Sequence, residues 1–259
     1  MEHSNGYIVG FAAAVCGVCA IIVSTTAVEL KPLAERNERL AIQSQVLSLA
    51  GIAAEGSLSD DEIEAVYSER IEPRIIALET GELVDGIEAA GWDQQARMKD
   101  PETSAPAPDN PARVRRLPNE SVVYYVRSDS GAMEKVILPI QGQGLWGTLY
   151  GYLAVARDGQ TIEGLTFYRH KETPGLGGEV DNPRWKALWP GRKIYGEDGE
   201  VAIRVNKGSA GPVDTAPYEV DGLSGATITS RGVTNTLAFW LGPDAFGPYL
   251  DRLRQEGSS

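Results

Sequence analysis

The chain has few of the residues that build thiol, metal or nucleic-acid sites. It has two cysteines and two histidines, and 24 Lys and Arg stand against 36 Asp and Glu, for a formal net charge of -12. Nucleic-acid binding needs clustered basic side chains, so this balance excludes a nucleic-acid partner and disfavours an anionic membrane surface. Both cysteines lie near the N-terminus, so the rest of the chain can form no disulfide and no cysteine-ligated metal or iron-sulfur centre.

An apolar run without charge or proline extends from Ile8 to Val28. As a helix it spans roughly 31 Å, enough to cross the hydrocarbon core. We therefore expect a tail over residues 1–6 and a transmembrane helix over residues 7–28, with a cleaved signal peptide as the alternative. The C-x-x-C spacing of Cys16 and Cys19 lies within this run, where thiols are ordinarily small apolar side chains. Acids and bases alternate after the run, so charge leaves the orientation open.

Helices and turns dominate the first part of the soluble region, residues 29–99. Apolar residues at helical spacing predict a helix over residues 32–54 that continues the membrane helix. Ser59 and Glu62 have capping-box spacing and predict a second helix that ends near Arg70. A short strand is expected over residues 75–84, with a turn at Thr80-Gly81. Five prolines over residues 100–118 predict an exposed loop.

Residues 119–259 are expected to form an α+β domain, a twisted antiparallel sheet with packed helices. Strand-like runs follow one another over residues 122–127, 134–140, 145–156 and 161–169. Asp158-Gly159 joins the last two as a hairpin, and shorter strands are expected at residues 193–195 and 201–205. A helix with Val233 and Leu237 on its apolar face ends at Gly242-Pro243, and an amphipathic stretch follows over residues 245–253.

The segment from Gly142 to Gly147 reads G-x-G-x-x-G. A dinucleotide fingerprint must open a helix within a βαβ unit, and here a strand-like run follows, so we exclude that interpretation. The glycines predict a bend at the entry to a strand, where a flat ligand or a second backbone can approach. Trp146 is a candidate stacking surface on this bend, and burial in the core is the alternative.

The segment from His170 to Glu179 combines polar side chains, a proline turn and three glycines. A lone histidine with Glu172 and Glu179 offers few ligands for a metal, so we expect none. We favour a loop whose backbone N–H groups contact the carbonyls and ring nitrogens of a ligand. Acid-base work by His170 and Glu172, and a plain glycine-rich turn, are the alternatives.

The segment from Asp221 to Arg231 is a small-residue loop with four hydroxyls before a predicted helix. Unpaired N–H groups and the helix dipole favour a phosphate there. Gly225 and Ala226 leave Thr227 sterically open, and an exposed hydroxyl can accept a phosphoryl group. Helix capping by Ser and Thr is the alternative. Ser-His-Asp hydrolysis fits poorly, because the chain has no G-x-S-x-G elbow.

Asp221-x-x-Ser224-Gly225-Ala226-Thr227 resembles the D-x-x-S-G-A-T motif of domains that receive FMN through a phosphoester to the last threonine. The whole chain resembles the C-subunit family of the sodium-translocating NADH:quinone oxidoreductase and, less closely, the G-subunit family of the related Rnf ferredoxin:NAD complex. The similarity runs from the membrane helix through four further stretches: Gly144-Leu145-Trp146 and residues 150–154, 167–179 and 181–186.

The resemblance implies an electron-transfer subunit of a multi-subunit sodium-transporting NADH:quinone reductase, with no complete catalytic cycle alone. FMN attached covalently to Thr227 would pass single electrons between an iron-sulfur centre and the flavin of the B subunit. The implied partners are the B, D and E subunits, with a flavin transferase during maturation. The implied place is the bacterial inner membrane, with a cytoplasmic N-terminus and a periplasmic flavin domain.

The resemblance also implies cofactor-binding residues besides Thr227. Thr173 and Leu176 would border the ring, Trp146 would cover it, and Lys207 or Arg231 would neutralise the phosphate. The full set of expected cofactor-binding residues is Thr227, Asp221, Ser224, Gly225, Ala226, Trp146, His170, Glu172, Thr173, Leu176, Gly177 and Lys207. The open alternatives are an Rnf-type flavin carrier and a membrane-anchored periplasmic binding module without flavin.

Overall fold

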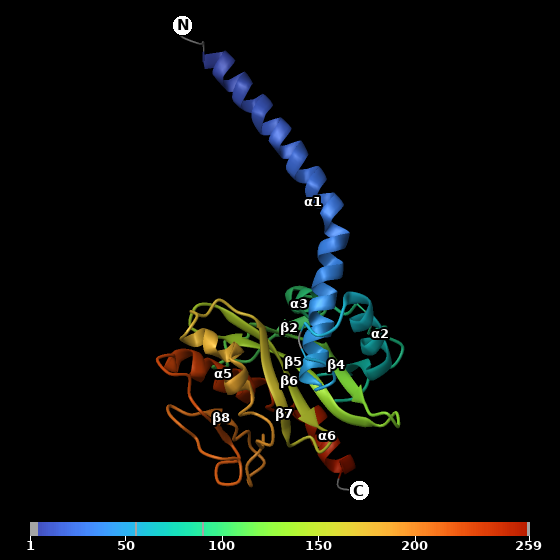
Figure 1. The fold of residues 1–259 in the computed structure, drawn as a ribbon, viewed down its shortest axis with the longest axis vertical. Coiled ribbons are helices and arrows are strands. Elements are labelled where there is room, and N and C mark those ends of the chain that lie inside the picture. The colour runs from blue at the N-terminus through green and yellow to red at the C-terminus, as the bar shows by residue number, and fades with distance from the viewer. Residues whose placement is uncertain (1–4, 55, 90, 258–259) are drawn as a thin grey trace.

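A computed structural model describes residues 5–54, 56–89 and 91–257, and its longest element is the N-terminal helix α1, Asn5–Leu49. The first half of α1 is apolar and exposed, and it extends away from the rest of the molecule (Figure 1). This half fits a single-pass membrane anchor. The second half buries Leu40, Val46 and Leu47 against the domain, as a continuation of the membrane helix predicts. Residues 1–4 of the expected tail lie outside the described residues, and α1 already includes residues 5 and 6.

Helix α2, Asp60–Arg70, follows α1 and begins at the predicted capping box. The Glu62 carboxylate accepts hydrogen bonds from the backbone N–H of Ser59 at 2.9 Å and from its hydroxyl at 2.7 Å. These two hydrogen bonds to the charged form lower the pKa of Glu62. The expected start and end of this helix are confirmed.

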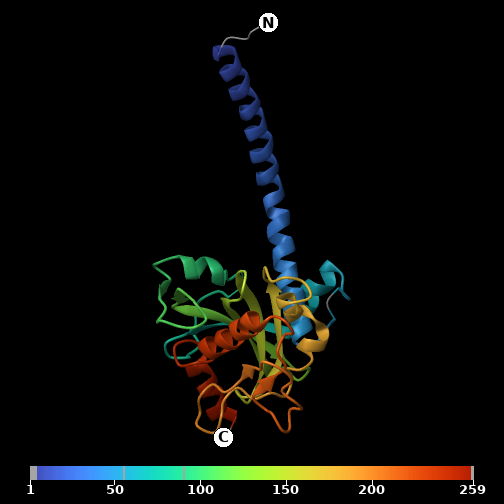
Figure 2. The ribbon, with the colours of Figure 1, turned by 90° about the vertical axis from the view of Figure 1, so that its left-hand side faces the viewer.

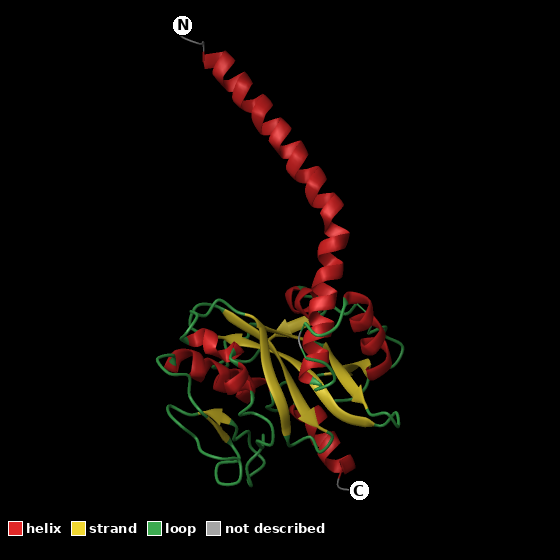
Figure 3. Ribbon diagram, in the orientation of Figure 1, coloured by secondary structure: helices red, strands yellow, loops and turns green. Residues whose placement is uncertain are grey.

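A five-stranded antiparallel sheet in the order β1-β4-β5-β6-β7 forms the centre of the domain (Figure 3). Its strands are β1 (Ile71–Ala77), β4 (Glu120–Arg127), β5 (Met133–Gln143), β6 (Thr148–Ala156) and β7 (Ile162–Arg169). The predicted four-strand meander is confirmed, and so is the hairpin turn, where Gly159 has a positive φ of 63°. Strand β1 begins earlier than expected and ends at Ala77, before a turn with Gly81 at φ 68°.

The two faces of the sheet carry two different cores. On one face, side chains of α1 and α2 pack with a group that includes Tyr124 and Tyr152. On the other face, Val136 and Leu153 pack with the C-terminal helices α5 (Thr227–Trp240) and α6 (Gly247–Gly257). Residues along each strand alternate between these cores, as the period of two requires. Figures 1 and 2 show α1 and α5 on different sides of the sheet.

The proline-rich segment is more ordered than an exposed loop. It follows α3, Gln94–Lys99, and contains the paired short strands β2 (Ser104–Pro106) and β3 (Arg116–Pro118). The expectation of an exposed loop is wrong for Ala112 and Val114, which are buried in the core. The Asn110 side chain folds this turn by accepting the Val114 N–H at 3.0 Å and donating to its carbonyl at 2.8 Å.

The segment between β7 and α5 has little regular structure. It contains the 3-10 helix η1 (Gly177–Asp181), the short helix α4 (Pro183–Lys186), and the parallel pair β8 (Arg204–Val205) and β9 (Glu219–Val220). The strands expected at residues 193–195 and 201–205 are wrong except for β8, because Lys193, Tyr195 and Val201 form only isolated bridges. Helix α5 ends at Trp240 and α6 begins at Gly247, each two residues from its expected limit.

Candidate functional site

Three segments distant in sequence meet at one end of the sheet. They are the β5–β6 turn over residues 144–147, the loop over residues 170–178 that follows β7, and the N-terminal turn of α5 with the residues before it. A Cβ atom on Gly225 would lie 2.9 Å from a Leu176 methyl group, and one on Gly232 would lie 2.5 Å from the Gln143 carbonyl oxygen. The three glycine-containing segments singled out from the sequence therefore form one surface.

This surface lies at the end of the domain from which the exposed apolar half of α1 extends (Figure 1). A Cβ on Gly164, in the middle of β7, would lie 2.8 Å from Leu49 at the end of α1. Nearer the C-terminal end of β7, Tyr168 is within the electrostatic reach of Glu38, whose charge raises the pKa of the phenol after the larger effect of burial. Helix α1 thus runs along β7 toward the end of the strand at which the loop over residues 170–178 begins.

Of the four hydroxyls near the acceptor motif, two are hydrogen-bonded and two are not, among the described residues. Thr229 is buried and donates to Glu172 Oε2 at 2.5 Å, and the Ser230 hydroxyl accepts the backbone N–H of Leu223 at 3.0 Å. Ser224 and Thr227 are exposed, and their hydroxyls make no hydrogen bond within the described residues. The N-cap of α5 is Ala226, which has no hydroxyl, so helix capping by Thr227 is wrong as an account of this threonine.

The N-terminus of α5 offers positive charge around Thr227. Thr227 is the first residue of the helix, so its N–H and those of the next two residues have no acceptor within the helix. These amides and the helix dipole favour an anion at this position. The Arg231 side chain, one turn on, is exposed and makes no ion pair among the described residues. The arrangement can hold a phosphate on Thr227.

Exposed apolar side chains lie on the three segments that meet at the start of α5. Trp146 is 64% exposed, and Leu145, Leu176 and Ile228 are exposed by 42 to 54%. Burial of Trp146 in the core, the alternative to a stacking surface, is therefore wrong. Large apolar side chains left in water near an anion site suit a ligand with a phosphate and a flat ring system. Thr173 is exposed in the same loop, and its carbonyl closes the loop by accepting N–H bonds from Leu176 at 3.1 Å and Gly178 at 2.9 Å.

Glu172 lies beneath this surface, where it is 5% exposed. Its Oε1 accepts the backbone N–H of Trp146 at 2.9 Å, and its Oε2 accepts the Thr229 hydroxyl. Gly177, which is also buried, leaves room for this carboxylate, since a Cβ there would lie 2.5 Å from Oε2. Glu172 thus contacts all three segments but presents no side-chain oxygen on the open surface.

His170 is held within its own loop. Its Nδ1 accepts the Glu172 N–H at 3.1 Å, so the ring proton lies on Nε2, which donates to Asp181 Oδ2 at 2.7 Å. Both ring nitrogens are occupied, which leaves the ring no free nitrogen for acid-base work. Among the described residues, no group of three or more His, Cys, Asp or Glu side chains is placed to hold a metal ion.

Asp221 and Lys207 lie behind the acceptor loop rather than beside Thr227. The Asp221 carboxylate accepts the Ala210 N–H at 2.7 Å, and its carbonyl accepts the Trp185 indole N–H at 2.8 Å. A Cβ on Gly222 would lie 3.1 Å from the backbone of Lys207, whose side chain is exposed and without an ion pair among the described residues. Asp221 therefore fixes the start of the motif, and Lys207 borders it through the backbone.

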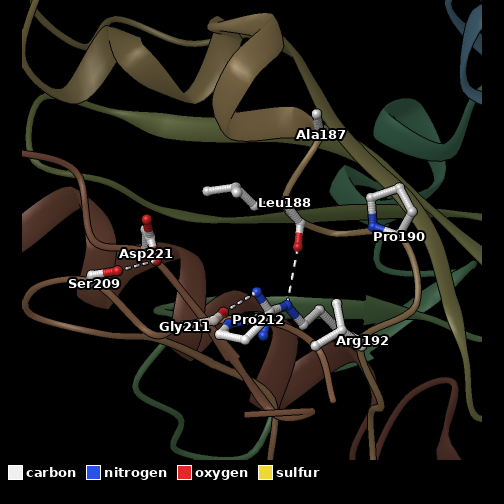
Figure 4. A pocket seen from close by; sticks show the side chains of 9 residues that line it. Ala187, Leu188, Pro190, Arg192, Ser209, Gly211, Pro212 and Asp221 are labelled. Carbon is white, nitrogen blue, oxygen red and sulfur yellow. Dashed lines mark hydrogen bonds between the residues drawn. The ribbon is translucent and has the colours of Figure 1, made fainter. Parts of the chain in front are cut away.

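A pocket of about 340 Å³ opens on this far side, with Asp221 in its wall (Figure 4). The buried Arg192 side chain lines it and donates to the carbonyls of Leu188, Gly211 and Ala216 at 2.5 to 3.1 Å. The bonds to Gly211 and Ala216 hold the loop over residues 209–216 in place, and the bond to Leu188 ties Arg192 to its own segment. Asp221, the first residue of the acceptor motif, accepts a hydrogen bond from Ala210 in this loop. The pocket wall therefore supports the acceptor motif.

Sequence reasoning missed the buried Thr229 and the exposed Leu145 and Ile228 as parts of this site. The helical period offered a signal for Thr229, because it precedes Val233 by four residues and Leu237 by eight, and so shares their buried face. Leu145 and Ile228 gave no comparable signal, since single apolar residues in turns are ordinarily packing residues.

Comparisons with known proteins bear on the same residues. Residues 144–242 match the family model described as the FMN-binding domain. The chain is 43% identical over 244 residues to the C subunit of the Na(+)-translocating NADH-quinone reductase of Pseudomonas aeruginosa, covering 93% of each chain. It is 46% identical over 239 residues to the protein of the same name from Vibrio alginolyticus, covering 92% of this chain and 90% of the relative.

Two crystal structures share the fold. NqrC of Shewanella oneidensis is 33% identical and superposes with a TM-score of 0.77, over 86% of this chain and 99% of that one. The C subunit of the Na(+)-translocating NADH-quinone reductase from Parabacteroides distasonis is 31% identical, with a TM-score of 0.64 over 85% of this chain and 96% of that one.

Proposed function

The chain belongs to the C-subunit family of the Na(+)-translocating NADH-quinone reductases and has an FMN-binding domain, and from this membership we propose that it holds FMN as a phosphoester on Thr227. In this role the chain carries single electrons between an iron-sulfur centre and the flavin of the B subunit. The family is an oxidoreductase family of membrane complexes, so the chain works with other subunits. The sodium-pump relatives favour this proposal over an Rnf-type carrier and over a binding module without flavin.

The observation that carries the proposal is the state of the Thr227 hydroxyl. It is exposed and unpaired at the first position of α5, next to backbone N–H groups that lack acceptors. Thr229 and Ser230, two and three residues later, are buried and already hydrogen-bonded. Attachment at Thr227 therefore costs no internal hydrogen bond, and the new phosphate meets favourable charge.

FMN supplies the one-electron chemistry when it is bound, and the chain supplies binding, orientation and electrostatics. We assign neutralisation of the phosphate to the α5 amides with Arg231, since Lys207 lies behind the acceptor loop. Leu176 and Thr173 would border the ring, and Trp146 would cover it. Ser224, Gly225 and Ala226 keep the approach to Thr227 open, and Gly225, at φ 71°, adopts a turn that an L side chain would strain.

We propose the B, D and E subunits as the neighbours of this site, with a flavin transferase as its partner during maturation. We place the chain in the bacterial inner membrane, with its N-terminus cytoplasmic and its flavin domain periplasmic. The position of the site at the α1 end of the domain supports membrane subunits as its neighbours, whereas the orientation rests on the family membership alone. Along α1, Glu38, whose charge reaches Tyr168, is about 15 Å from Val28 at the end of the apolar run, at 1.5 Å per residue.

The proposal is tested in the assembled complex, produced with an active flavin transferase. Thr227→Ala should abolish NADH-driven quinone reduction and sodium uptake in membrane vesicles, while Ser224→Ala should keep at least half of both activities. Assembly is checked by co-purification of the other subunits. A Thr227→Ala complex that assembles and keeps wild-type activity would refute the attachment at Thr227.

A further inference from the structure

Glu172 is a buried carboxylate with no cation among its contacts. It is 5% exposed, and both of its oxygens accept a hydrogen bond, from the Trp146 N–H and from the Thr229 hydroxyl. A carboxylate is costly to bury, and the hydrogen bonds that it accepts must offset that cost. A loop that only connects two elements could keep this carboxylate in water at no cost, so the burial of Glu172 points to a specific role.

The two oxygens of Glu172 join two separate walls of the site. Oε1 holds the turn that carries Trp146, and Oε2 holds Thr229 in the first turn of α5, two residues after Thr227. The backbone of Glu172 belongs to the loop that carries Leu176. One side chain therefore spans all three segments that surround the Thr227 hydroxyl.

Two glycines leave the space that the Glu172 carboxylate occupies between the Trp146 turn and α5. A Cβ on Gly144 would lie 2.6 Å from Glu172 Oε1, and a Cβ on Gly177 would lie 2.5 Å from Oε2 and 2.6 Å from the Thr229 hydroxyl. Any side chain at either position would displace the carboxylate. Since the glycines come from two different loops, the fit around Glu172 involves the whole site.

We infer that Glu172 is a positioning residue, whose buried carboxylate ties the Trp146 turn to the first turn of α5 and sets the opening above Thr227. It acts on the cofactor through Trp146 and α5 and does not touch it. The inference rests on the proposed function, because the opening matters only if Thr227 carries FMN. The hydrogen bonds of Glu172 to Trp146 and Thr229, however, can be tested without flavin.

The first measurement uses the full chain in detergent with Thr227→Ala, so that no flavin is attached. Hydrogen exchange of the Trp146 amide should be at least about tenfold faster in Glu172→Ala, because the amide loses its buried acceptor. Glu172→Gln, which keeps an acceptor oxygen toward Trp146 and can still pair with Thr229, should stay within about twofold of its parent. Unchanged exchange in Glu172→Ala, or equal acceleration in both variants, would overturn the inference.

The second measurement uses the flavin-loaded full chain. Thr229→Val removes one hydrogen bond at nearly constant volume, and Thr229→Ser restores it. Thr229→Val should lower the fluorescence anisotropy of the attached flavin and raise its emission at least twofold, and Thr229→Ser should return both to wild-type values. A destabilised but otherwise unchanged domain would not move these values well below its melting temperature. Equal emission in all three proteins would contradict the inference.

The two outcomes separate the inference from the proposed function. Wild-type chain without flavin, despite an active transferase, would refute attachment and leave the exchange result valid. Flavin present but insensitive to Thr229→Val would refute the positioning role alone. If Glu172→Ala fails to fold, the Thr229 pair still decides the question.

Discussion

The two faces of the central sheet are packed in different ways, and the difference separates what holds the domain together from what positions the site. On the α1 face, bulky side chains such as Leu47 and Tyr152 fill the space between helix and strands. On the α5 face near the site, glycines bring backbones together, as at Gly232 against the Gln143 carbonyl. The α1 face attaches the domain to its anchor through buried area, whereas the α5 face needs close backbone contact to fix the N-terminus of a helix.

This contrast separates stability from function. On the α1 face, substitutions that remove side-chain volume should have the largest effect on stability. They should leave the loop that carries Thr227 intact at permissive temperature. Small additions of volume on the α5 face should disturb the acceptor as well as the stability. Exposed residues around Thr227 should affect the cofactor with little effect on folding.

The largest effect on stability is expected for Leu47→Ala. Leu47 is 1% exposed between α1 and the sheet, so its truncation should lower the free energy of unfolding by about 2 to 5 kcal/mol. Chemical denaturation of the full chain in detergent measures this, with Leu33→Ala, at a 54% exposed position of the same helix, as the control. Similar losses in both variants would show that the α1 face is not a packed core.

Gly232→Ala should cost about 1 to 3 kcal/mol, because the new methyl group meets the Gln143 carbonyl and pushes α5 from the sheet. It should also reduce the yield of covalent flavin below that of wild type. Gly208→Ala is the matched control, since a Cβ there meets nothing within 4 Å. Full flavin yield in Gly232→Ala would mean that close backbone contact does not position the acceptor.

Alkaline pH should destabilise the domain from both faces of the sheet. Burial raises the pKa of Tyr195 and Tyr249 on the α5 face, and the α1 face carries a comparable group of phenols. Burial raises the pKa of Tyr67, Tyr124 and Tyr152 above the ordinary value near 10. Above pH 10 the unfolded chain loses these protons first, so it binds fewer protons than the folded chain and stability falls as pH rises. Each phenol contributes at most about 1.4 kcal/mol per pH unit in that range.

Denaturation between pH 8 and pH 11 measures this slope. Tyr152→Phe should make it shallower, whereas Tyr218→Phe, outside this group, should leave it unchanged. Identical slopes in Tyr152→Phe and wild type would remove Tyr152 as a cause.

The smallest effect on stability is expected for Trp146→Ala. The side chain is 64% exposed, so the free energy of unfolding should change by less than about 0.5 kcal/mol. The attached flavin should nevertheless become more fluorescent, because it loses the aromatic surface expected to cover it. A large loss of stability with unchanged flavin emission would reverse the roles assigned to Trp146.

Much of the fold follows from local sequence signals. The capping box at Ser59, the turn at Gly159 and the alternation along β4 to β7 each depend on residues close in sequence. Strand β9 and its parallel pairing with β8 escaped prediction, because each strand is two residues long and a long irregular loop joins them. Ala112 and Val114 escaped because their burial depends on the Asn110 turn rather than on periodicity.

The candidate site was predictable in its parts and not in its arrangement. The motif ending at Thr227 is visible in the sequence. Which of the four hydroxyls are hydrogen-bonded, however, depends on how α5 packs against the loops around it. The family resemblance implied Glu172 among the cofactor-binding residues, in a loop that is polar and rich in glycine. Its burial depends on contacts with Trp146 and Thr229, 26 residues before and 57 residues after it, which no local pattern encodes.

The central claim is that one hydroxyl among four carries the flavin. Trypsin should release residues 208–231 as one peptide, because no Lys or Arg lies between Lys207 and Arg231, and this peptide holds Ser224, Thr227, Thr229 and Ser230. Fragment-ion mass spectrometry of the transferase-treated protein should place the mass of FMN minus water on Thr227 alone. Flavin on any of the other three hydroxyls, or an unmodified peptide from protein exposed to an active transferase, would contradict the account.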